Sequence, residues 1–181
     1  LRGDRRPGTP LPANPDYSHA NELVADIAAR GKFCVGVAAY PEKHPEARTL
    51  DEDMDNLKRK VDAGASFAIT QLFFDNKVYF DFVEKCRARG ITVPIIPGIL
   101  PVLKYSQLDG FIKTCGVKIP PEFAAGLEAV KNDADAVARF GVDWAFGQCR
   151  ELLRSGAPGI HFYTFNRSKA AKEVLARLAG K

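Results

Sequence analysis

The chain has 181 residues, of which 46% are hydrophobic and 27% charged, and its formal net charge is +4. This length is enough for one domain with its own core, and the composition is that of an ordinary globular protein. No apolar run approaches the ~20 residues of a membrane-spanning helix, and no signal-peptide core follows the first residues, LRGDRRP. We therefore predict one cytoplasmic domain over residues 1–181, with no membrane contact.

Charge and cysteine spacing argue against two further classes of function. The basic residues are scattered through the predicted helices, so we do not expect a nucleic-acid surface, and phosphate on a small ligand is more plausible. No Cys-x-x-Cys pair and no histidine cluster is present, so we predict neither a metal site nor a disulfide framework. We expect buried or inert thiols at Cys34, Cys86, Cys115 and Cys149.

Apolar periodicity and turn residues predict helices that alternate with strands, and such alternation forms a parallel sheet. Thr49 and Glu52 have the spacing of a helix capping box, and Gly64 ends the helix that they open. Residues 1–4 read as the end of a strand whose start is missing. In chain order we predict a loop at 5–16, a helix at 18–30, strands at 33–39, 67–73, 91–96 and 160–164, helices at 49–64, 75–89, 104–115, 121–130 and 132–155, and a last helix from the cap Asn166 to Leu178.

Polar residues follow the predicted strands, and Gln71 is the clearest case. It comes after the apolar run 67–69, which is typical of a strand covered on both faces. In parallel sheets and barrels, ligands bind at the carboxyl ends of the strands, so several polar side chains on one rim would make a site. The other candidates at strand ends are Arg2, Asp4, Tyr40, His44, the loop 97–101, Tyr163, Asn166 and Arg167.

The helix after Thr49 carries a second polar pattern. Asp53, Asn56 and Lys60 are spaced i, i+3, i+7 and therefore share one face. That face is either solvated or holds ribose hydroxyls and a diphosphate, with Lys60 on the phosphate. Two readings also stay open elsewhere: Gln71 could cap backbone groups, and Tyr163 could pack in the core.

Six segments of the chain together resemble the methylenetetrahydrofolate reductase family, from one end of the chain to the other. They lie at 1–4, 38–47, 56–65, 68–75, 95–101 and 161–167. The resemblance implies an α/β fold: a partial TIM (β/α)8 barrel, from the end of the fourth strand through the eighth β-α unit. It also implies that the N-terminal portion of the barrel is absent here. With no sign of a regulatory domain, the chain resembles the bacterial type.

The resemblance implies a flavoprotein of one-carbon metabolism and methionine biosynthesis. FAD would be reduced by NADH or NADPH and would pass hydride to 5,10-methylenetetrahydrofolate, giving 5-methyltetrahydrofolate by ping-pong kinetics. The complete protein would be a homo-oligomer.

The resemblance also implies roles for particular residues. The carboxylate of Asp4 would be catalytic, because it would stabilise the cationic 5-iminium form of the folate and disfavour the anionic reduced flavin. Substrate or nicotinamide contacts would come from Gln71, Gln107, Phe111 and Arg167. The residues around FAD would be Arg2, Gly3, Asp4, Ala20, Tyr40, His44, Asp53, Asn56, Arg59 and Lys60.

The chain departs from the family pattern at one position. The general acid of the family is a glutamate near an early strand, and no glutamate of this chain matches that motif. We therefore expect this polypeptide alone to be inactive. One alternative is a non-catalytic remnant of the same fold that binds a nucleotide or packs as a subunit. Another is an unrelated barrel enzyme that binds phosphate.

Overall fold

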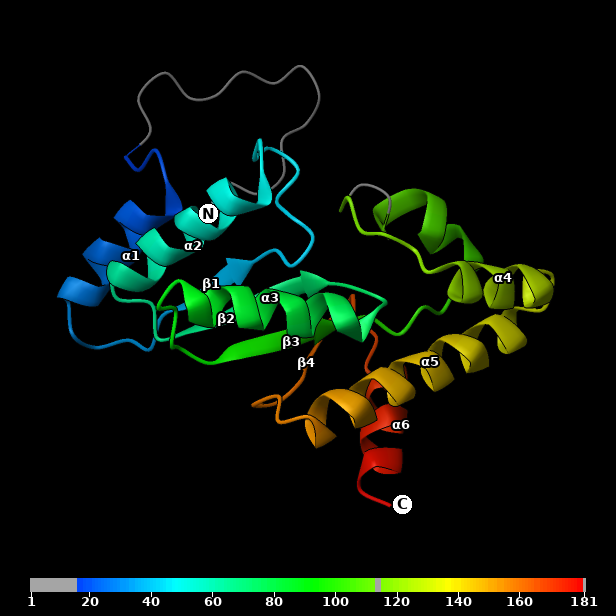
Figure 1. Ribbon diagram of the computed structural model, residues 1–181. Coiled ribbons are helices and arrows are strands. Elements are labelled where there is room, and N and C mark those ends of the chain that lie inside the picture. The colour runs from blue at the N-terminus through cyan, green and yellow to red at the C-terminus, as the bar shows by residue number, and fades with distance from the viewer. Residues whose placement is uncertain (1–15, 113–114, 181) are drawn as a thin grey trace.

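The computed structural model describes residues 16–112 and 115–180, except for the side chains of Asp109 and Phe111. Its centre is a parallel four-stranded sheet in the order β1-β2-β3-β4 (Figure 1). Each strand pairs with its neighbour in the chain, as expected when every connection is a helical crossover. The predicted α/β fold with a parallel sheet is confirmed. The strands are β1 (Gly36–Ala39), β2 (Phe67–Leu72), β3 (Ile95–Ile99) and β4 (His161–Phe162).

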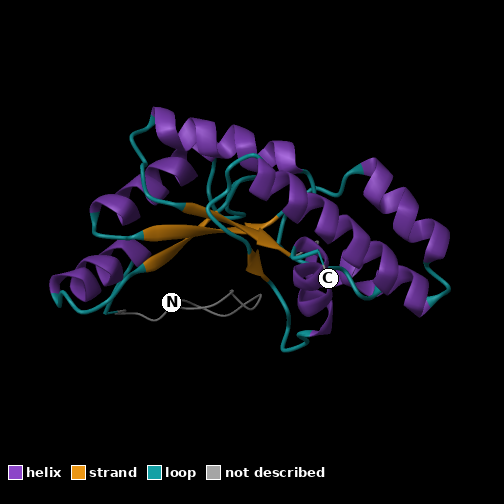
Figure 2. Ribbon diagram, turned by 90° about the horizontal axis from the view of Figure 1, so that it is seen from below, coloured by secondary structure: helices purple, strands orange, loops and turns teal. Residues whose placement is uncertain are grey.

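The helices lie around one side of this curved sheet (Figure 2). In β2, Ala68, Thr70 and Leu72 are buried under that layer, whereas the alternate side chains on the opposite face are only half-buried. The described helices are α1 (Ala20–Ala29), α2 (Leu50–Asp62), α3 (Asn76–Ala88), α4 (Pro121–Val130), α5 (Ala134–Arg154) and α6 (Lys169–Leu178), with a 3-10 turn η1 (Tyr105–Gln107) and a π turn η2 (Leu108–Ile112).

The core has two parts. The larger cluster joins the sheet to the helices around it and includes Met54, Phe82 and Ile95, all at most 2% exposed. The smaller cluster lies beneath α4 and is built around Phe123, whose ring stacks on Phe74 at a centroid distance of 4.6 Å. The first cluster holds the strands in place, and the second attaches the α4–α5 pair to the end of β2.

The third strand lies further along the chain than predicted, at Ile95–Ile99 instead of 91–96. Ile91 follows α3 directly, and its N–H donates to the carbonyl of Cys86 in the last turn of that helix. Pro97 and Gly98 were predicted to end the strand, yet both lie inside it. A glycine is required at this point of the strand. A Cβ on Gly98 would lie 2.4 Å from the carbonyl oxygen of Thr70 and 2.6 Å from the ring of Tyr163.

Two further predictions were wrong in detail. Asn166 does not cap the last helix; it adopts a left-handed backbone with φ 61°, and Ser168 precedes α6 instead. Asparagine tolerates this region better than most residues, so Asn166 forms the turn after β4. The segment 104–115 does not form one helix, because Gly110 has non-helical φ and ψ of −93° and −109°. The first and last strands are also shorter than predicted. The predicted strand end at 1–4 lies outside the described residues.

Candidate functional site at the carboxyl ends of the strands

The register of the sheet brings the carboxyl ends of all four strands to one edge. Ala39 pairs with Thr70, and Leu72 pairs with Gly98. Ile99 in turn pairs with Phe162. The residues that follow these pairs, including the predicted Tyr40 and Tyr163, therefore lie along a single rim. This is the edge at which parallel α/β sheets bind ligands.

The loop from β1 to α2 forms one part of this rim. The ring of Tyr40 meets the ring of His44 edge to face at a centroid distance of 4.6 Å. The N–H of His44 donates to the carboxylate of Asp53 at 2.8 Å, which ties the loop to α2. Nδ1 of His44 accepts the N–H of Glu46 at 3.0 Å, so the neutral ring carries its proton on Nε2. Three residues predicted to line the cofactor are thus linked.

Lys60 connects α2 to the first strand. Its ammonium group donates to the carbonyl of Ala38, 22 residues earlier. Burial lowers the pKa of Lys60, and the nearby carboxylate of Asp53 partly offsets this effect. The solvated-face reading is therefore wrong for Lys60. It agrees with the exposure of Asn56, whose side-chain oxygen accepts a hydrogen bond from the equally exposed Arg59. The outcome is a partly desolvated cation at the rim, with the exposed cation of Arg59 directly before it in the sequence.

Gln71 lies on the half-buried face of β2. Its Oε1 accepts the backbone N–H of Leu72 at 3.0 Å, so the backbone-capping reading holds for the oxygen. Its Nε2 donates to no other group within the described part of the chain. Gln71 therefore presents two N–H donors on a fixed side chain.

Thr70 is a rim residue that sequence reasoning missed, and it contacts Gly98 of the predicted segment 97–101. The fully buried hydroxyl of Thr70 accepts the N–H of Gly98 at 2.9 Å, and the Tyr163 hydroxyl donates to the carbonyl of Thr70 at 2.9 Å. The packing reading of Tyr163 is thus supported, and burial raises the pKa of its phenol. The signal that could have indicated Thr70 is its polar side chain within the mainly apolar run 67–72.

Glu42 is a second residue that was missed. Its carboxylate accepts the N–H of Lys118 at 3.1 Å and joins the β1–α2 loop to the segment before α4. Burial raises the pKa of Glu42, and the charge of Asp75 adds to this effect. Position in the sequence offered no signal for the contact, because 76 residues separate its partners.

The other predicted site residues are less closely tied to this rim. Gln107 uses its Oε1 locally, accepting the N–H groups of Leu103 and Lys104 at 2.8 Å each. Arg167 is exposed in the turn after β4, and Ala20 is the exposed first residue of α1. Arg2, Gly3 and Asp4, together with the side chain of Phe111, lie outside the described part.

The described cysteines differ in their exposure to solvent. Cys86 and Cys149 are buried, and burial raises the pKa of their thiols to about 11 and about 12. Cys34 is exposed, so of the two expected states, buried or inert, only the second remains a prediction for it. Within 16–112 and 115–180, no three His, Cys, Asp or Glu side chains are grouped as metal ligands. No helix in the same ranges is long and apolar enough to cross a membrane.

Fold and rim together define an α/β protein with a parallel sheet whose strands end along one polar edge. The family model for methylenetetrahydrofolate reductase matches residues 1–179, and the chain belongs to this family. It is 43% identical to 5,10-methylenetetrahydrofolate reductase of Escherichia coli over 178 residues, which cover 98% of this chain and 59% of that protein. It is 41% identical to a probable methylenetetrahydrofolate reductase (NADPH) of Caenorhabditis elegans, covering 98% of this chain and 27% of that protein.

The chain therefore spans only part of these relatives. Among solved structures, it resembles an uncharacterized protein from Clostridium thermocellum that binds two copies of 5-methyl-5,6,7,8-tetrahydrofolic acid. The TM-score is 0.54 at 20% identity, and the match covers 86% of this chain and 56% of that one. At this level of identity the similarity concerns the fold.

Proposed function

We propose that the chain forms the C-terminal portion of the (β/α)8 barrel of a flavin-dependent methylenetetrahydrofolate reductase. The reaction converts 5,10-methylenetetrahydrofolate to 5-methyltetrahydrofolate with NADH or NADPH as electron donor, in cytoplasmic one-carbon metabolism and methionine biosynthesis. FAD, when bound, would supply the hydride carrier. The observation that carries the proposal is the family match over residues 1–179, which includes the linked side chains of the rim.

The residues near α2 fit the charged end of such a cofactor. Lys60 is a partly desolvated cation, and Arg59 adds an exposed guanidinium close by. Cations and amides are suitable partners for a diphosphate and for ribityl hydroxyls, and Asn56 offers such an amide. Asp53 would hold the loop in position through His44, so that Tyr40 and His44 present their rings to the ligand. Arg2, Gly3, Asp4 and Ala20 complete the proposed cofactor set.

The proposed substrate contacts have different degrees of support. The free amide donors of Gln71 suit the acceptor edge of a pterin. Arg167 makes no ion pair within the described residues, so its guanidinium is available to a folate carboxylate or a nucleotide phosphate. Gln107 can contribute only its Nε2 while its oxygen stays on the backbone. Phe111 would stack on p-aminobenzoate or adenine, and Asp4 would stabilise the developing positive charge of the folate.

Flavin spectroscopy of the complete protein that contains this chain tests the proposal. We expect a yellow protein whose absorbance near 450 nm bleaches with NADH or NADPH under anaerobic conditions and returns when 5,10-methylenetetrahydrofolate is added. A protein that binds the flavin but shows neither change would favour the non-catalytic alternative. A protein that binds no flavin would exclude the proposed activity.

We further propose that residues 1–181 alone do not turn over and that the complete protein is a homo-oligomer. The half-buried face of β2 supports the first statement, because parallel sheets are normally covered on both faces. Purified residues 1–181 should show no reductase activity under conditions in which the complete protein is active. Full activity of the shorter polypeptide would contradict the proposal, and light scattering of the complete protein would give its oligomeric state.

A further inference from the structure

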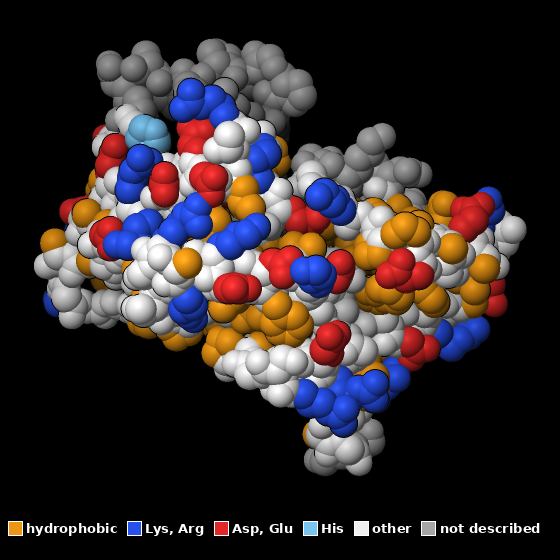
Figure 3. Space-filling model, in the orientation of Figure 1, with side chains coloured by type: hydrophobic (Ala, Val, Ile, Leu, Met, Phe, Trp, Pro, Cys, Tyr) orange, Lys and Arg blue, Asp and Glu red, His pale blue; other side chains and the backbone are white. Residues whose placement is uncertain are grey.

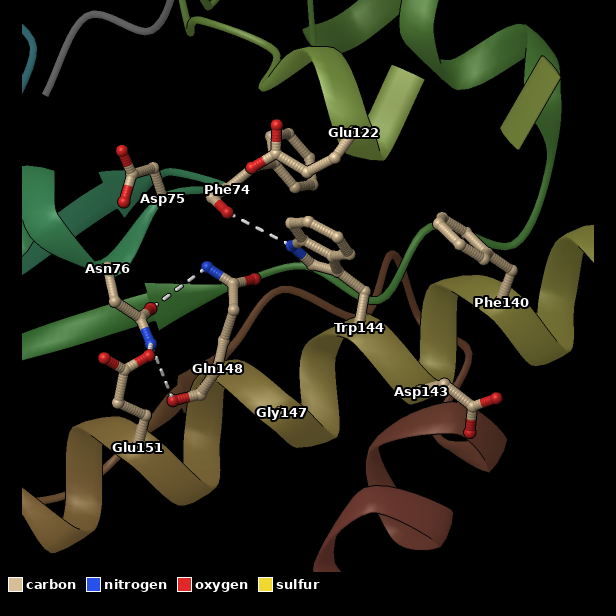
Figure 4. A pocket seen from close by; sticks show the side chains of 10 residues that line it. All are labelled: Phe74, Asp75, Asn76, Glu122, Phe140, Asp143, Trp144, Gly147, Gln148 and Glu151. Atoms are coloured by element: carbon tan, nitrogen blue, oxygen red, sulfur yellow. Dashed lines mark hydrogen bonds between the residues drawn. The ribbon is translucent and has the colours of Figure 1, made fainter. Parts of the chain in front are cut away.

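A pocket lies on the outer, helical side of the molecule. None of the residues that line it belongs to the candidate site at the strand ends. The pocket has a volume of about 450 Å³ and is formed where the end of β2 and the start of α3 meet α4 and α5 (Figure 4). This volume is within the range of small-molecule sites. Hydrophobic and acidic side chains lie side by side over α4 and α5 (Figure 3). The lining residues are Phe74, Asp75, Asn76, Glu122, Phe140, Asp143, Trp144, Gly147, Gln148 and Glu151.

The hydrogen-bond donors of this pocket are already used within the chain. The indole N–H of Trp144 donates to the carbonyl of Phe74 at 3.1 Å. The amide nitrogen of Gln148 donates to the carbonyl of Phe73 and to Oδ1 of Asn76, both at 3.2 Å. Nδ2 of Asn76 donates to the backbone carbonyl of Gln148 at 3.1 Å and to a carboxylate oxygen of Glu151 at 2.7 Å (Figure 4). A ligand would therefore meet few free donors.

The acceptors, in contrast, are only partly used within the chain. The carbonyl of Phe73 fixes the amide of Gln148, so its Oε1 points the other way, toward Trp144 (Figure 4). Gln148 is only 7% exposed, and this oxygen accepts no hydrogen bond from any described residue. Asp75, Glu122 and Glu151 line the pocket, and no described lysine or arginine does. One oxygen of Asp75 accepts the N–H of Lys77 and one of Glu151 accepts Nδ2 of Asn76, which leaves the second oxygen of each carboxylate and both oxygens of Glu122 for a ligand. The carboxylate of the remaining acid, Asp143, is paired with Arg177 at 2.6 Å.

The third feature of the pocket is Gly147, a helical glycine that packing does not require. Two other helical glycines are required by packing, since a Cβ on Gly141 would lie 1.8 Å from the carbonyl of Val102 and one on Gly126 would lie 2.2 Å from the ring of Phe140. A Cβ on Gly147 would meet nothing within 4 Å. Glycine inside a helix is unfavourable, and nothing in the described chain requires it at this position. The space above it is the pocket, between Trp144 and Glu151 (Figure 4).

We propose that this pocket binds a guanidinium cation, which stacks on Trp144 and donates to Oε1 of Gln148 and to the surrounding carboxylates. A guanidinium is planar, carries five N–H donors and no acceptor, and binds both aromatic faces and carboxylates. These properties match a pocket of aromatic rings and open acceptors. The group comes either from a free solute or from an arginine side chain of a second copy of the chain. The proposal does not depend on the reductase activity.

Trp144 lines the pocket and is the only tryptophan of residues 1–181, so the part of the emission that is lost in Trp144→Phe reports on the pocket. The probe is arginine blocked at both termini, titrated into the complete protein, with the same derivative of citrulline as the uncharged counterpart. Tetramethylammonium serves as a cation without N–H donors. We expect a saturable change in emission with the arginine derivative and at least tenfold weaker binding of both controls. Equal responses to all three compounds, or no saturable response, would overturn the proposal.

Two substitutions make the test independent of folding defects. Gly147→Leu fills the pocket while favouring the helix, and Glu151→Gln removes one charge while keeping an acceptor for Asn76. Each should weaken binding at least tenfold with an unchanged circular dichroism spectrum, whereas Glu173→Gln on the exposed side of α6 should not. Unchanged affinity in Gly147→Leu would contradict the proposal. Sedimentation distinguishes the two sources: a loss of oligomer mass in Gly147→Leu indicates an arginine of a second copy, and an unchanged mass indicates a free solute.

Discussion

The hydroxyl of Tyr163 donates a hydrogen bond of 2.9 Å to the backbone carbonyl of Thr70. The two residues are 93 positions apart and lie at the ends of β4 and β2, with β3 between them. The side chain of Tyr163 thus crosses above Gly98, which has no Cβ to obstruct it. The rim of the candidate site is held together by this contact, because β4 itself is only two residues long.

Tyr163→Phe tests the contribution of that hydrogen bond. The ring stays, but the carbonyl of Thr70 loses a partner, so the free energy of unfolding should fall by about 1–2 kcal/mol. Urea denaturation followed by circular dichroism measures the change. Tyr17→Phe is the matched control: its hydroxyl bonds to Asp26 at an exposed position, and its loss should cost less. Equal effects of the two substitutions would show that the Tyr163 contact does not stabilise the sheet.

Gly98→Ala tests the close approach of the strands. The new methyl group would lie 2.4 Å from the carbonyl oxygen of Thr70, so the backbone of β2 or the ring of Tyr163 would have to move. Such overpacking costs about 1–3 kcal/mol. Gly159→Ala is the control, since nothing lies within 4 Å of its added Cβ. A melting temperature that falls in Gly98→Ala alone supports the prediction, and an unchanged one in both variants contradicts it.

Local signals predicted some elements well and others poorly. The helix over 76–88 and the strand over 67–72 follow from apolar periodicity bounded by Asp75 and by Gly64, and both lie within a residue of their predicted limits. The strand at 95–99 was misplaced, because proline and glycine are turn residues in most local contexts. The chain stays extended there because Gly98 pairs with Leu72 and His161 in the sheet and leaves room for Tyr163, contacts that the local sequence does not reveal.

The candidate site, too, could be predicted from the sequence only in part. The strand ends indicated the rim, since the carboxyl edge of a parallel sheet follows from the order of elements alone. The contacts of Lys60 with Ala38 and of Glu42 with Lys118 could not be predicted, because they depend on how the helices and loops pack on the sheet. The split of the polar face of α2 into the half-buried Lys60 and the exposed Asn56 has the same origin.

Glu42→Gln should change the pH dependence of stability. The pKa of Glu42 is raised in the folded chain by burial, so between the unfolded value of 4.5 and the folded pKa the native state binds more protons than the unfolded state. This group therefore lowers the free energy of unfolding as pH rises through that window. Glutamine cannot ionise, and its oxygen can still accept the N–H of Lys118.

We therefore expect Glu42→Gln to gain stability relative to the unsubstituted chain as pH rises from about 4 to 7. Thermal melts at a series of pH values, with Glu173→Gln on α6 as the control, measure the difference. A difference that is constant with pH, or that shrinks as pH rises, would contradict the prediction.

Lys60→Met tests the proposed cofactor contact in the complete protein. Methionine replaces the aliphatic stem but not the charge, so FAD should bind about tenfold more weakly or worse, as expected for the loss of a charge-assisted hydrogen bond of about 1.5–3 kcal/mol. Lys58→Met is a close control, because Lys58 lies on the same helix and pairs with Asp62. Flavin fluorescence titration gives both dissociation constants. If the two variants bind FAD equally well, Lys60 serves only to join α2 to the carbonyl of Ala38, and the diphosphate lies elsewhere.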